Sequence, residues 1–193
     1  MITQRFNSNK EWWGYNKQTN SSFMGLVYLI NDLVEHFQYQ PDTTEKMIEI
    51  GAYMGESTFL FACSGIFKEI DTIDPHSGRE EFNEMFGYTW DDVKSEFEKN
   101  TRHFDNIVHH KDFSYNIVDN FDDKEYDFVY IDANHTYESI KQDLELYLPK
   151  VRSRGVISGH DYTDNWVGVR QAVDETFGSL DKIYTDGSWI KYL

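Results

Sequence analysis

Two acidic residues and two histidines stand at the ends of two apolar segments in the second half of the chain. Asp132 closes the run 126–131, where a carboxylate is costly unless it faces a site that uses it. His135 follows three residues later, and the pair His160-Asp161 ends the next predicted strand. A histidine has an ordinary pKa of about 6.5, which suits a general base near neutral pH. The alternative for His135 is a capping role at the helix that follows.

A second group of residues, near the front of the chain, is typical of a ligand-binding turn. Residues 46–50 read as a short buried strand, and the run from Ser57 reads as the start of a helix. Gly51 and Gly55 stand at the turn between them, where the backbone must approach a ligand closely. Asp74 ends the next predicted strand and could accept hydrogen bonds from ribose hydroxyls. Together these features predict a nucleoside-binding site.

The periodicity of the chain predicts the framework that positions these residues. Apolar residues at helical spacing predict helices, and short apolar and aromatic runs predict buried parallel strands. The two alternate, which predicts an α/β fold: one mostly parallel sheet with helices on both faces. A two-residue hairpin turn at Asp186-Gly187 adds an antiparallel strand. The predicted strands cover 46–50, 70–74, 106–109, 126–132, 155–159, 182–185 and 188–193, and the predicted helices are marked by 23–37, 57–62, 93–104, 140–148 and 169–177.

Four motifs in this order resemble class I S-adenosylmethionine-dependent methyltransferases. They are 49–57, 73–76, 131–137 and 159–162, within a region from Lys46 to Leu193. Within that class the chain is most similar to a small O-methyltransferase and cephalosporin-hydroxylase-like family, of methyltransferase family 24 type. The resemblance implies a Rossmann-like, seven-stranded sheet whose last strand is antiparallel. It also implies ligand binding at the carboxyl ends of the first, second and fourth strands.

The resemblance gives roles to individual residues. Asp74 would bind the ribose, Glu49 would lie near the methionine moiety, and Asp112 would bind the adenine amino group. The cofactor-binding residues that we predict are Glu49, Gly51, Tyr53, Gly55, Ser57, Asp74, His76, Asp112, Phe113, Ser114 and Asp132. The catalytic residues that we predict are Asp132, His135 and His160, with His135 as the general base.

Glu56 favours a donor without phosphate. It falls in the first turn of a predicted helix, where the macrodipole is positive. The pyrophosphate of a dinucleotide would need that place, and a carboxylate there would repel it. S-adenosylmethionine has no phosphate and carries a positive sulfonium, so an acidic site suits it. Tyr53 stands where many members of the class carry a second glycine.

The resemblance also implies a divalent metal. In the family, an acidic residue at the Asp132 position and an acidic pair after the fifth strand hold it, and here His160 replaces one of that pair. The predicted ligands are therefore Asp132, His160 and Asp161, for Mg²⁺ or Mn²⁺. Magnesium prefers oxygen ligands, whereas an imidazole favours manganese, iron or zinc. Alternatively, no metal binds and His160 is a second base or a substrate contact.

The composition of the chain limits the kinds of molecule it is expected to bind and the cellular compartment in which it is expected to lie. The 193 residues carry a formal net charge of −16, with 18 basic residues against 34 acidic ones, which argues against nucleic acid as a partner. The single cysteine, Cys63, excludes a disulfide framework and suits a reducing compartment. No apolar run reaches the roughly 18 residues that span a bilayer, and no signal peptide is visible. We therefore expect a cytoplasmic protein that does not bind membranes.

We expect a single methyltransferase domain over residues 1–193. Residues 1–45 would form an N-terminal extension and helix, and residues 46–193 the S-adenosylmethionine-binding core. Residues 76–104 would recognise the acceptor, or else form a contact between copies in a homo-oligomer. Trp12 and Trp13 would belong to a lid or would clamp the core.

The predicted function is S-adenosylmethionine-dependent O-methylation of a sugar or another small hydroxylated acceptor, free or in a glycan. A hydroxyl is a poor nucleophile until its proton is taken, so a base or a metal is needed. One alternative is an NAD-dependent oxidoreductase on a doubly wound sheet, which Glu56, the glycine spacing and the terminal hairpin disfavour. The other is a catalytically silent nucleoside-binding module.

Overall fold

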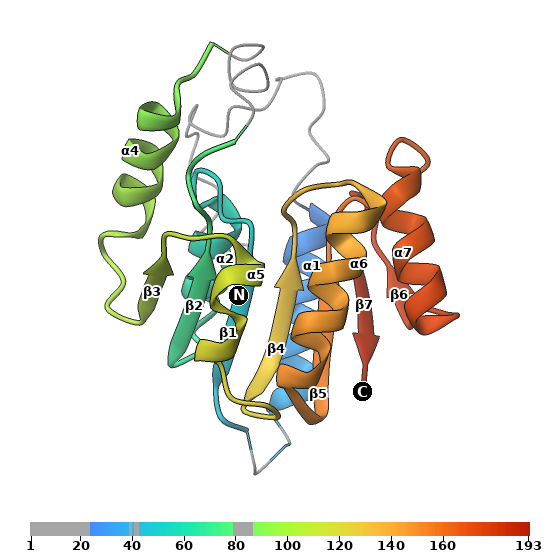
Figure 1. Cartoon of the computed structure of the whole chain (residues 1–193). Coiled ribbons are helices and arrows are strands. Elements are labelled where there is room, and N and C mark those ends of the chain that lie inside the picture. The colour runs from blue at the N-terminus through green and yellow to red at the C-terminus, as the bar shows by residue number, and fades with distance from the viewer. Residues whose placement is uncertain (1–23, 39, 41–42, 79–86) are drawn as a thin grey trace.

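A single sheet forms the centre of the molecule (Figure 1). The computed structural model describes residues 24–38, 40, 43–78 and 87–193. The strands are β1 (Lys46–Ile50), β2 (Glu69–Ile73), β3 (Ile107–His110), β4 (Tyr126–Ile131), β5 (Val151–Gly159), β6 (Lys182–Ile183) and β7 (Trp189–Tyr192). The α-helices are α1 (Met24–Phe37), α2 (Glu56–Ser64), α4 (Trp90–Thr101), α5 (Ser114–Ile117), α6 (Tyr137–Tyr147) and α7 (Val167–Phe177), and two 3₁₀ turns are η2 (Val118–Asn120) and η3 (Leu148–Lys150).

The seven strands are arranged in the order β3-β2-β1-β4-β5-β7-β6. β1 to β5 run parallel to one another, and β7 is antiparallel to both of its neighbours, β5 and β6. The predicted fold class is therefore confirmed. The strand order reverses where β1 pairs with β4, and ligands of open α/β sheets bind at such a switch point, outside the carboxyl ends of the strands.

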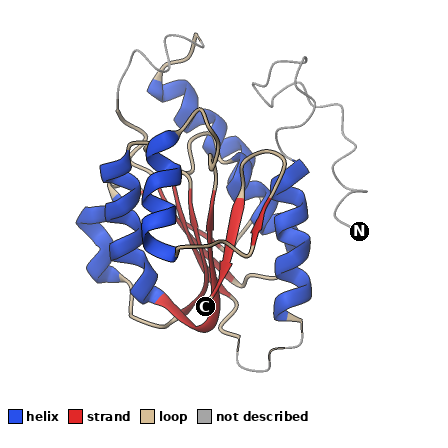
Figure 2. Cartoon of the chain, turned by 90° about the vertical axis from the view of Figure 1, so that its right-hand side faces the viewer, coloured by secondary structure: helices blue, strands red, loops and turns tan. Residues whose placement is uncertain are grey.

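Two hydrophobic clusters cover the two faces of the sheet, and Figure 2 shows helices on both sides of it. Successive residues of a strand point to opposite faces, so Met47 packs with α1 and α2 while Ile48 packs with α6 and α7. Phe61 and Phe128 lie in the first cluster. Trp189 lies in the second. Because the strands are covered on both faces, they read as continuous apolar runs.

The terminal hairpin differs from the prediction in its loop. The backbone N–H of Tyr184 donates to the carbonyl of Ser188 at 2.8 Å, so the loop is the three residues 185–187, and the predicted two-residue turn was wrong. Gly187 has φ +89° and occupies the left-handed position that such loops require. The carboxylate of Asp186 accepts from the N–H of Ser188 at 2.9 Å and from the N–H of Leu26, at the start of α1, at 2.8 Å. The hairpin therefore holds the N-terminal end of α1 at the carboxyl edge of the sheet.

Helix boundaries agree with the prediction except for local end effects. α4 begins three residues earlier than its apolar stripe, because Thr89 and Asp92 form a reciprocal capping box. The short helix α5 has too few residues to show a period. Trp12, Trp13 and residues 79–86 of the predicted acceptor segment lie outside the described residues. In the described ranges, no helix is both long and apolar enough to cross a membrane.

Candidate active site

Most of the predicted site residues lie at or just after the carboxyl ends of β1, β2, β4 and β5. These strands are neighbours in one sheet (Figure 1). Gly51 follows β1, Asp74 follows β2, Asp132 follows β4, and His160-Asp161 follows β5. Parallel pairing brings these strand ends together because each strand terminates in register with its neighbour, as at Ile50 beside Ile131. The edge therefore joins the two groups of residues that the sequence separates by some eighty positions.

The glycine turn touches the end of β4 through its backbone. Gly51 has φ +90°, and a Cβ atom there would lie 2.1 Å from the carbonyl oxygen of Asp132. Gly55 has φ +78°, and its Cβ would lie 2.9 Å from the Phe97 ring of α4. Tyr53, which replaces a common glycine, adopts φ +46°. Glycine at position 51 is thus required by the contact with β4 as well as by the turn.

The carboxylate of Asp74 organises this turn. Its Oδ2 accepts hydrogen bonds from the backbone N–H groups of Ala52 and Tyr53 at 3.0 and 2.8 Å. Its Oδ1 accepts from the N–H of His76 at 2.7 Å. Asp74, predicted to bind the ribose, therefore fixes the backbone of the glycine turn, and it is 9 % exposed.

Glu49 is fully buried at the centre of a hydroxyl network. The hydroxyls of Ser57 and Thr58 on α2 and of Thr72 on β2 all donate to its carboxylate. Burial raises the pKa of the Glu49 carboxyl to about 7, against the opposing influence of these three hydrogen bonds. Ser57, one of the predicted cofactor-binding residues, donates its hydroxyl to Glu49.

His76 and Glu56 flank the turn. The His76 Nε2 lies 2.9 Å from the carbonyl of Tyr53, and its ring contacts those of Phe97 and His109. Glu56 opens α2 as predicted, and burial, with the charge of Glu96 added, raises the pKa of its carboxyl to about 7. Its repulsion of a pyrophosphate is therefore weaker at neutral pH than the sequence suggests.

The predicted adenine-binding segment follows β3. The Asp112 carboxylate accepts from the N–H of Phe113 and from the amide of Asn116, both at 2.7 Å, and these bonds lower its pKa. The hydroxyl of Ser114 donates to the buried carboxylate of Asp143 on α6 at 2.6 Å. Phe113 is exposed and stacks on Tyr115. Asp143, which the sequence did not single out, thus supports this segment from below.

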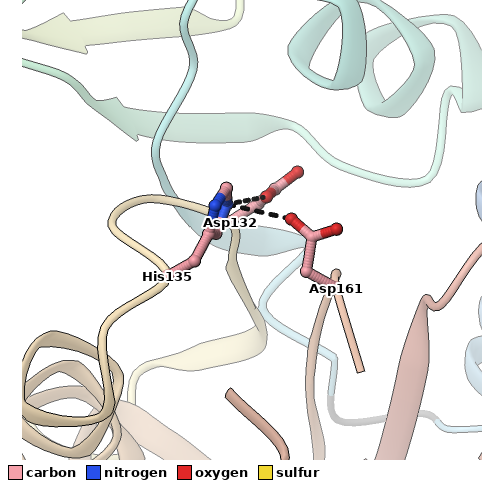
Figure 3. A group of neighbouring side chains, drawn as sticks. All are labelled: Asp132, His135 and Asp161. Atoms are coloured by element: carbon pink, nitrogen blue, oxygen red, sulfur yellow. Dashed lines mark ion pairs between the residues drawn. The ribbon is translucent and has the colours of Figure 1, made fainter. Parts of the chain in front are cut away.

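Three further side chains converge beside the glycine turn (Figure 3). The Nε2 atom of His135 lies 2.9 Å from Oδ2 of Asp161 and 3.6 Å from Oδ1 of Asp132. One ligand atom from each of the three lies within 4.8 Å of the others. These residues, Asp132, His135 and Asp161, are called the acidic cluster below. The loop that leads into α6 carries His135, and the end of β5 carries Asp161.

Electrostatics in the acidic cluster favour a cation between the two carboxylates. Burial alone would lower the pKa of His135, but hydrogen bonds to Asp132 and Asp161, together with their charges, outweigh it and raise the pKa to about 10. The hydrogen bonds from the two histidines hold the pKa of Asp161 far below its usual range, although burial opposes this. Without another cation, His135 carries the positive charge that these carboxylates require.

His160 lies at the side of the acidic cluster rather than within it. Its Nδ1 is 3.3 Å from Oδ1 of Asp161, and its backbone N–H donates to the carbonyl of Ile131 at 3.2 Å. The three ligand atoms that converge belong to Asp132, Asp161 and His135, so His135 stands where we predicted His160 as a ligand. Strand ends were predictable from the sequence, but side-chain directions at those ends were not.

Trp166 is a neighbour of the acidic cluster that the sequence analysis missed. Its ring centroid lies 4.4 Å from that of His135. It belongs to the loop before α7, outside any apolar stripe, so periodicity gave no signal for it. Trp166 lies thirty-one residues after His135 in the sequence, and the packing of α6 against α7 brings the two side chains into contact.

Comparison with known proteins identifies the family to which the chain belongs. The model of a family described as "Methyltransferase domain" matches residues 48–162, more than half of the chain. The chain belongs to this methyltransferase family. The match includes the glycine turn, Asp74 and all three residues of the acidic cluster. The predicted identification as an S-adenosylmethionine-dependent methyltransferase is therefore confirmed, and the nicotinamide alternative loses its support.

The similar proteins include one curated sequence and several solved structures. An uncharacterized protein, y4gI, of Sinorhizobium fredii is 26 % identical over 120 residues, which cover 60 % of this chain but only 13 % of that protein. The O-methyltransferase NovP has a TM-score of 0.69 at 15 % identity, with 87 % of this chain and 79 % of that chain covered. CalS11, a TDP-rhamnose 3'-O-methyltransferase of calicheamicin biosynthesis, has a TM-score of 0.57 at 14 % identity, with 88 % and 79 % covered. At 14–15 % identity, these two structures support the assignment of the fold and do not by themselves identify the acceptor.

Proposed function

We propose that the methyltransferase transfers the methyl group to a hydroxyl oxygen of a small acceptor, and that the acidic cluster handles that hydroxyl. The observation that supports this most is the contact between the two halves of the site. The backbone of Gly51, in the donor turn, lies against the backbone of Asp132, in the acidic cluster. Donor and acceptor sites that touch can place their reactive atoms together, which supplies much of the rate enhancement of a displacement.

The donor half consists of the turn at Gly51, Asp74 and the segment Asp112–Ser114. Asp74 sets the turn through three backbone hydrogen bonds and keeps acceptor capacity toward the ligand edge. S-adenosylmethionine, when bound, supplies a methyl group activated by a positive sulfonium. Glu49 is buried below the turn and holds α2 against β1 and β2 through its hydrogen bonds. It can therefore support the donor half without contacting the ligand.

The acceptor half consists of the acidic cluster with His160 beside it. Two carboxylate oxygens and one imidazole nitrogen within 4.8 Å of each other fit a divalent cation such as Mn²⁺. Asp132, His135 and Asp161 would hold it, and it would polarise the acceptor hydroxyl. The carboxylates hold the imidazole of His135 in place, and a carboxylate oxygen of Asp132 or Asp161 would receive the hydroxyl proton, because the His135 nitrogen is occupied by the cation or by its own proton.

Replacement of His135 tests the acceptor half separately from the donor half. We expect His135→Ala to lower kcat about 100-fold or more while the Kd for S-adenosylhomocysteine stays near that of the wild type. The measurement is transfer of a labelled methyl group to a panel of hydroxylated acceptors, with calorimetric titration of S-adenosylhomocysteine. His103→Ala, an exposed histidine after α4, is the matched control and should change neither quantity.

Chelation tests the cation. Treatment with EDTA should abolish transfer, and Mn²⁺ should restore it in the wild type but not in Asp161→Asn. Transfer that is insensitive to chelation would remove the metal from the account and leave the charge of His135 in its place. Cofactor binding without transfer to any hydroxyl would instead support the catalytically silent module.

A further inference from the structure

Trp166 presents an aromatic surface directly beside the acidic cluster. It is 40 % exposed, and its ring rests on the His135 imidazole at 4.4 Å with the two planes 53° apart. An indole offers a large, rigid apolar area on which the apolar face of a ligand can stack. His135 therefore covers part of the indole, and the rest remains exposed beside a residue of the acidic cluster.

The backbone holds Trp166 in this position. A Cβ atom on Gly168 would lie 2.7 Å from the backbone nitrogen of Tyr137, so the start of α7 packs directly on the start of α6. The N–H of Trp166 donates to the carbonyl of Thr163 at 3.2 Å, and its own carbonyl accepts from the N–H of Arg170 at 3.2 Å. A side chain carried on such a fixed loop is preorganised for binding.

We propose that Trp166 is the platform on which a neutral hexopyranose stacks while one of its hydroxyls reaches the acidic cluster. This inference rests on the proposed function and names its acceptor class. A hexopyranose has an apolar C–H face that matches the indole, and hydroxyl donors around its rim. The indole and the cluster meet at His135, so one ring can contact both.

The charges around Trp166 favour a neutral acceptor over an anionic one. Asp132 and Asp161 lie on one side, and Asp164 lies two residues away in the same loop. The guanidinium of Arg170 lies against Asp164 and over the ring of Tyr162, 5.4 Å from its centroid. Either His135 or a bound cation balances the charge of Asp132 and Asp161, and Arg170 is paired with Asp164. These groups therefore suit a neutral ligand and can accept hydrogen bonds from its hydroxyl groups.

The test measures acceptor binding to the complex with S-adenosylhomocysteine. Saturation-transfer NMR is run with methyl hexopyranosides of the gluco, galacto, manno and rhamno series, each paired with its open-chain alditol. A nucleoside diphosphate hexose and a catechol complete the panel. The variants are Trp166→Ala and Trp166→Phe, and Val167→Ala is the control, since Val167 is the adjacent residue and is 67 % exposed.

We expect at least one methyl hexopyranoside to bind the wild type better than its alditol. Trp166→Ala should raise its Kd about tenfold, Trp166→Phe by about threefold or less, and Val167→Ala not at all, with the Kd for S-adenosylhomocysteine unchanged throughout. Binding of no pyranoside, equal binding to Trp166→Ala, or a preference for the diphosphate or the catechol would overturn the proposal. A wild type that does not bind S-adenosylhomocysteine would overturn the proposed function itself.

Discussion

Glu49 links three elements of the donor half through one carboxylate. It is fully buried, and it accepts hydrogen bonds from hydroxyls on α2 and β2 while it belongs to β1. Removing a charged carboxylate from water is costly, so the neutral form is favoured, and the pKa rises from 4.5 to about 7. Folding therefore depends on whether this group is protonated.

The sign of that dependence follows from the two pKa values. Between pH 4.5 and about 7, the folded protein retains the Glu49 proton and the unfolded chain has lost it. The free energy of unfolding therefore falls as pH rises through this window, by up to about 3 kcal/mol from this group. Glu49→Gln should remove this contribution, so its stability relative to the wild type should improve from pH 5 to pH 8.

Urea unfolding of both proteins at pH 5 and pH 8 checks this expectation. Asp112→Asn is the control, because the pKa of that carboxyl is lowered and it does not titrate in this window. An equal stability difference between Glu49→Gln and the wild type at both pH values would contradict the account of Glu49.

At the residue scale, the sequence analysis named all three residues of the acidic cluster as site residues but did not predict their arrangement. Asp132 and Asp161 could be placed at one edge because both end apolar strands. That His135 rather than His160 points between them depends on the loop into α6, whose path has no periodic signal. Trp166 and Asp143 were missed for the same reason, since their partners lie 31 and 29 residues away.

At the scale of elements, the glycine turn and the end of β4 form one structural unit. Gly51 cannot carry a side chain, because a Cβ would lie 2.1 Å from the Asp132 carbonyl oxygen. That oxygen is backbone and cannot move aside without shifting β4. The turn that we propose binds the donor and the residue that we propose handles the acceptor are therefore positioned by the same contact.

Replacement of two glycines by alanine separates the steric clash of an added Cβ from the strain of a side chain at positive φ. Gly65 also has a positive φ, +71°, but a Cβ there would meet nothing within 4 Å. Gly65→Ala should lower the free energy of unfolding by about 1 kcal/mol, and Gly51→Ala by about 3 kcal/mol or more. Urea titration measures both. If the two variants lose similar stability, the contact between Gly51 and β4 does not have the importance given to it here.

The order of elements was predictable, whereas their ends and short connections were less so. Alternating apolar periods gave every strand of the sheet and the antiparallel hairpin. The loop at Thr185–Gly187 is one residue longer than predicted, because Asp186 turns its carboxylate to the N–H groups of Ser188 and Leu26. The contact with Leu26 spans 160 residues and could not be predicted from local sequence.

At the scale of the whole molecule, the site lies where the strand order reverses. The proposed donor half follows β1, β2 and β3, the proposed acceptor half follows β4 and β5, and the pairing of β1 with β4 joins them. The fold is similar to that of NovP and CalS11, which are both O-methyltransferases. The curated relative y4gI is far longer than the matched region, so its own activity is a separate question.

The most direct test of the account is a crystal structure of the chain with S-adenosylhomocysteine. We expect the ligand to lie across the carboxyl ends of β1 and β2, with its ribose near Asp74 and its sulfur on the side of Asp132, His135 and Asp161. Because methyl transfer needs donor and acceptor in contact, this placement would join the two halves of the site. Ligand density away from the Gly51 turn, or a sulfur directed away from the acidic cluster, would contradict the central claim.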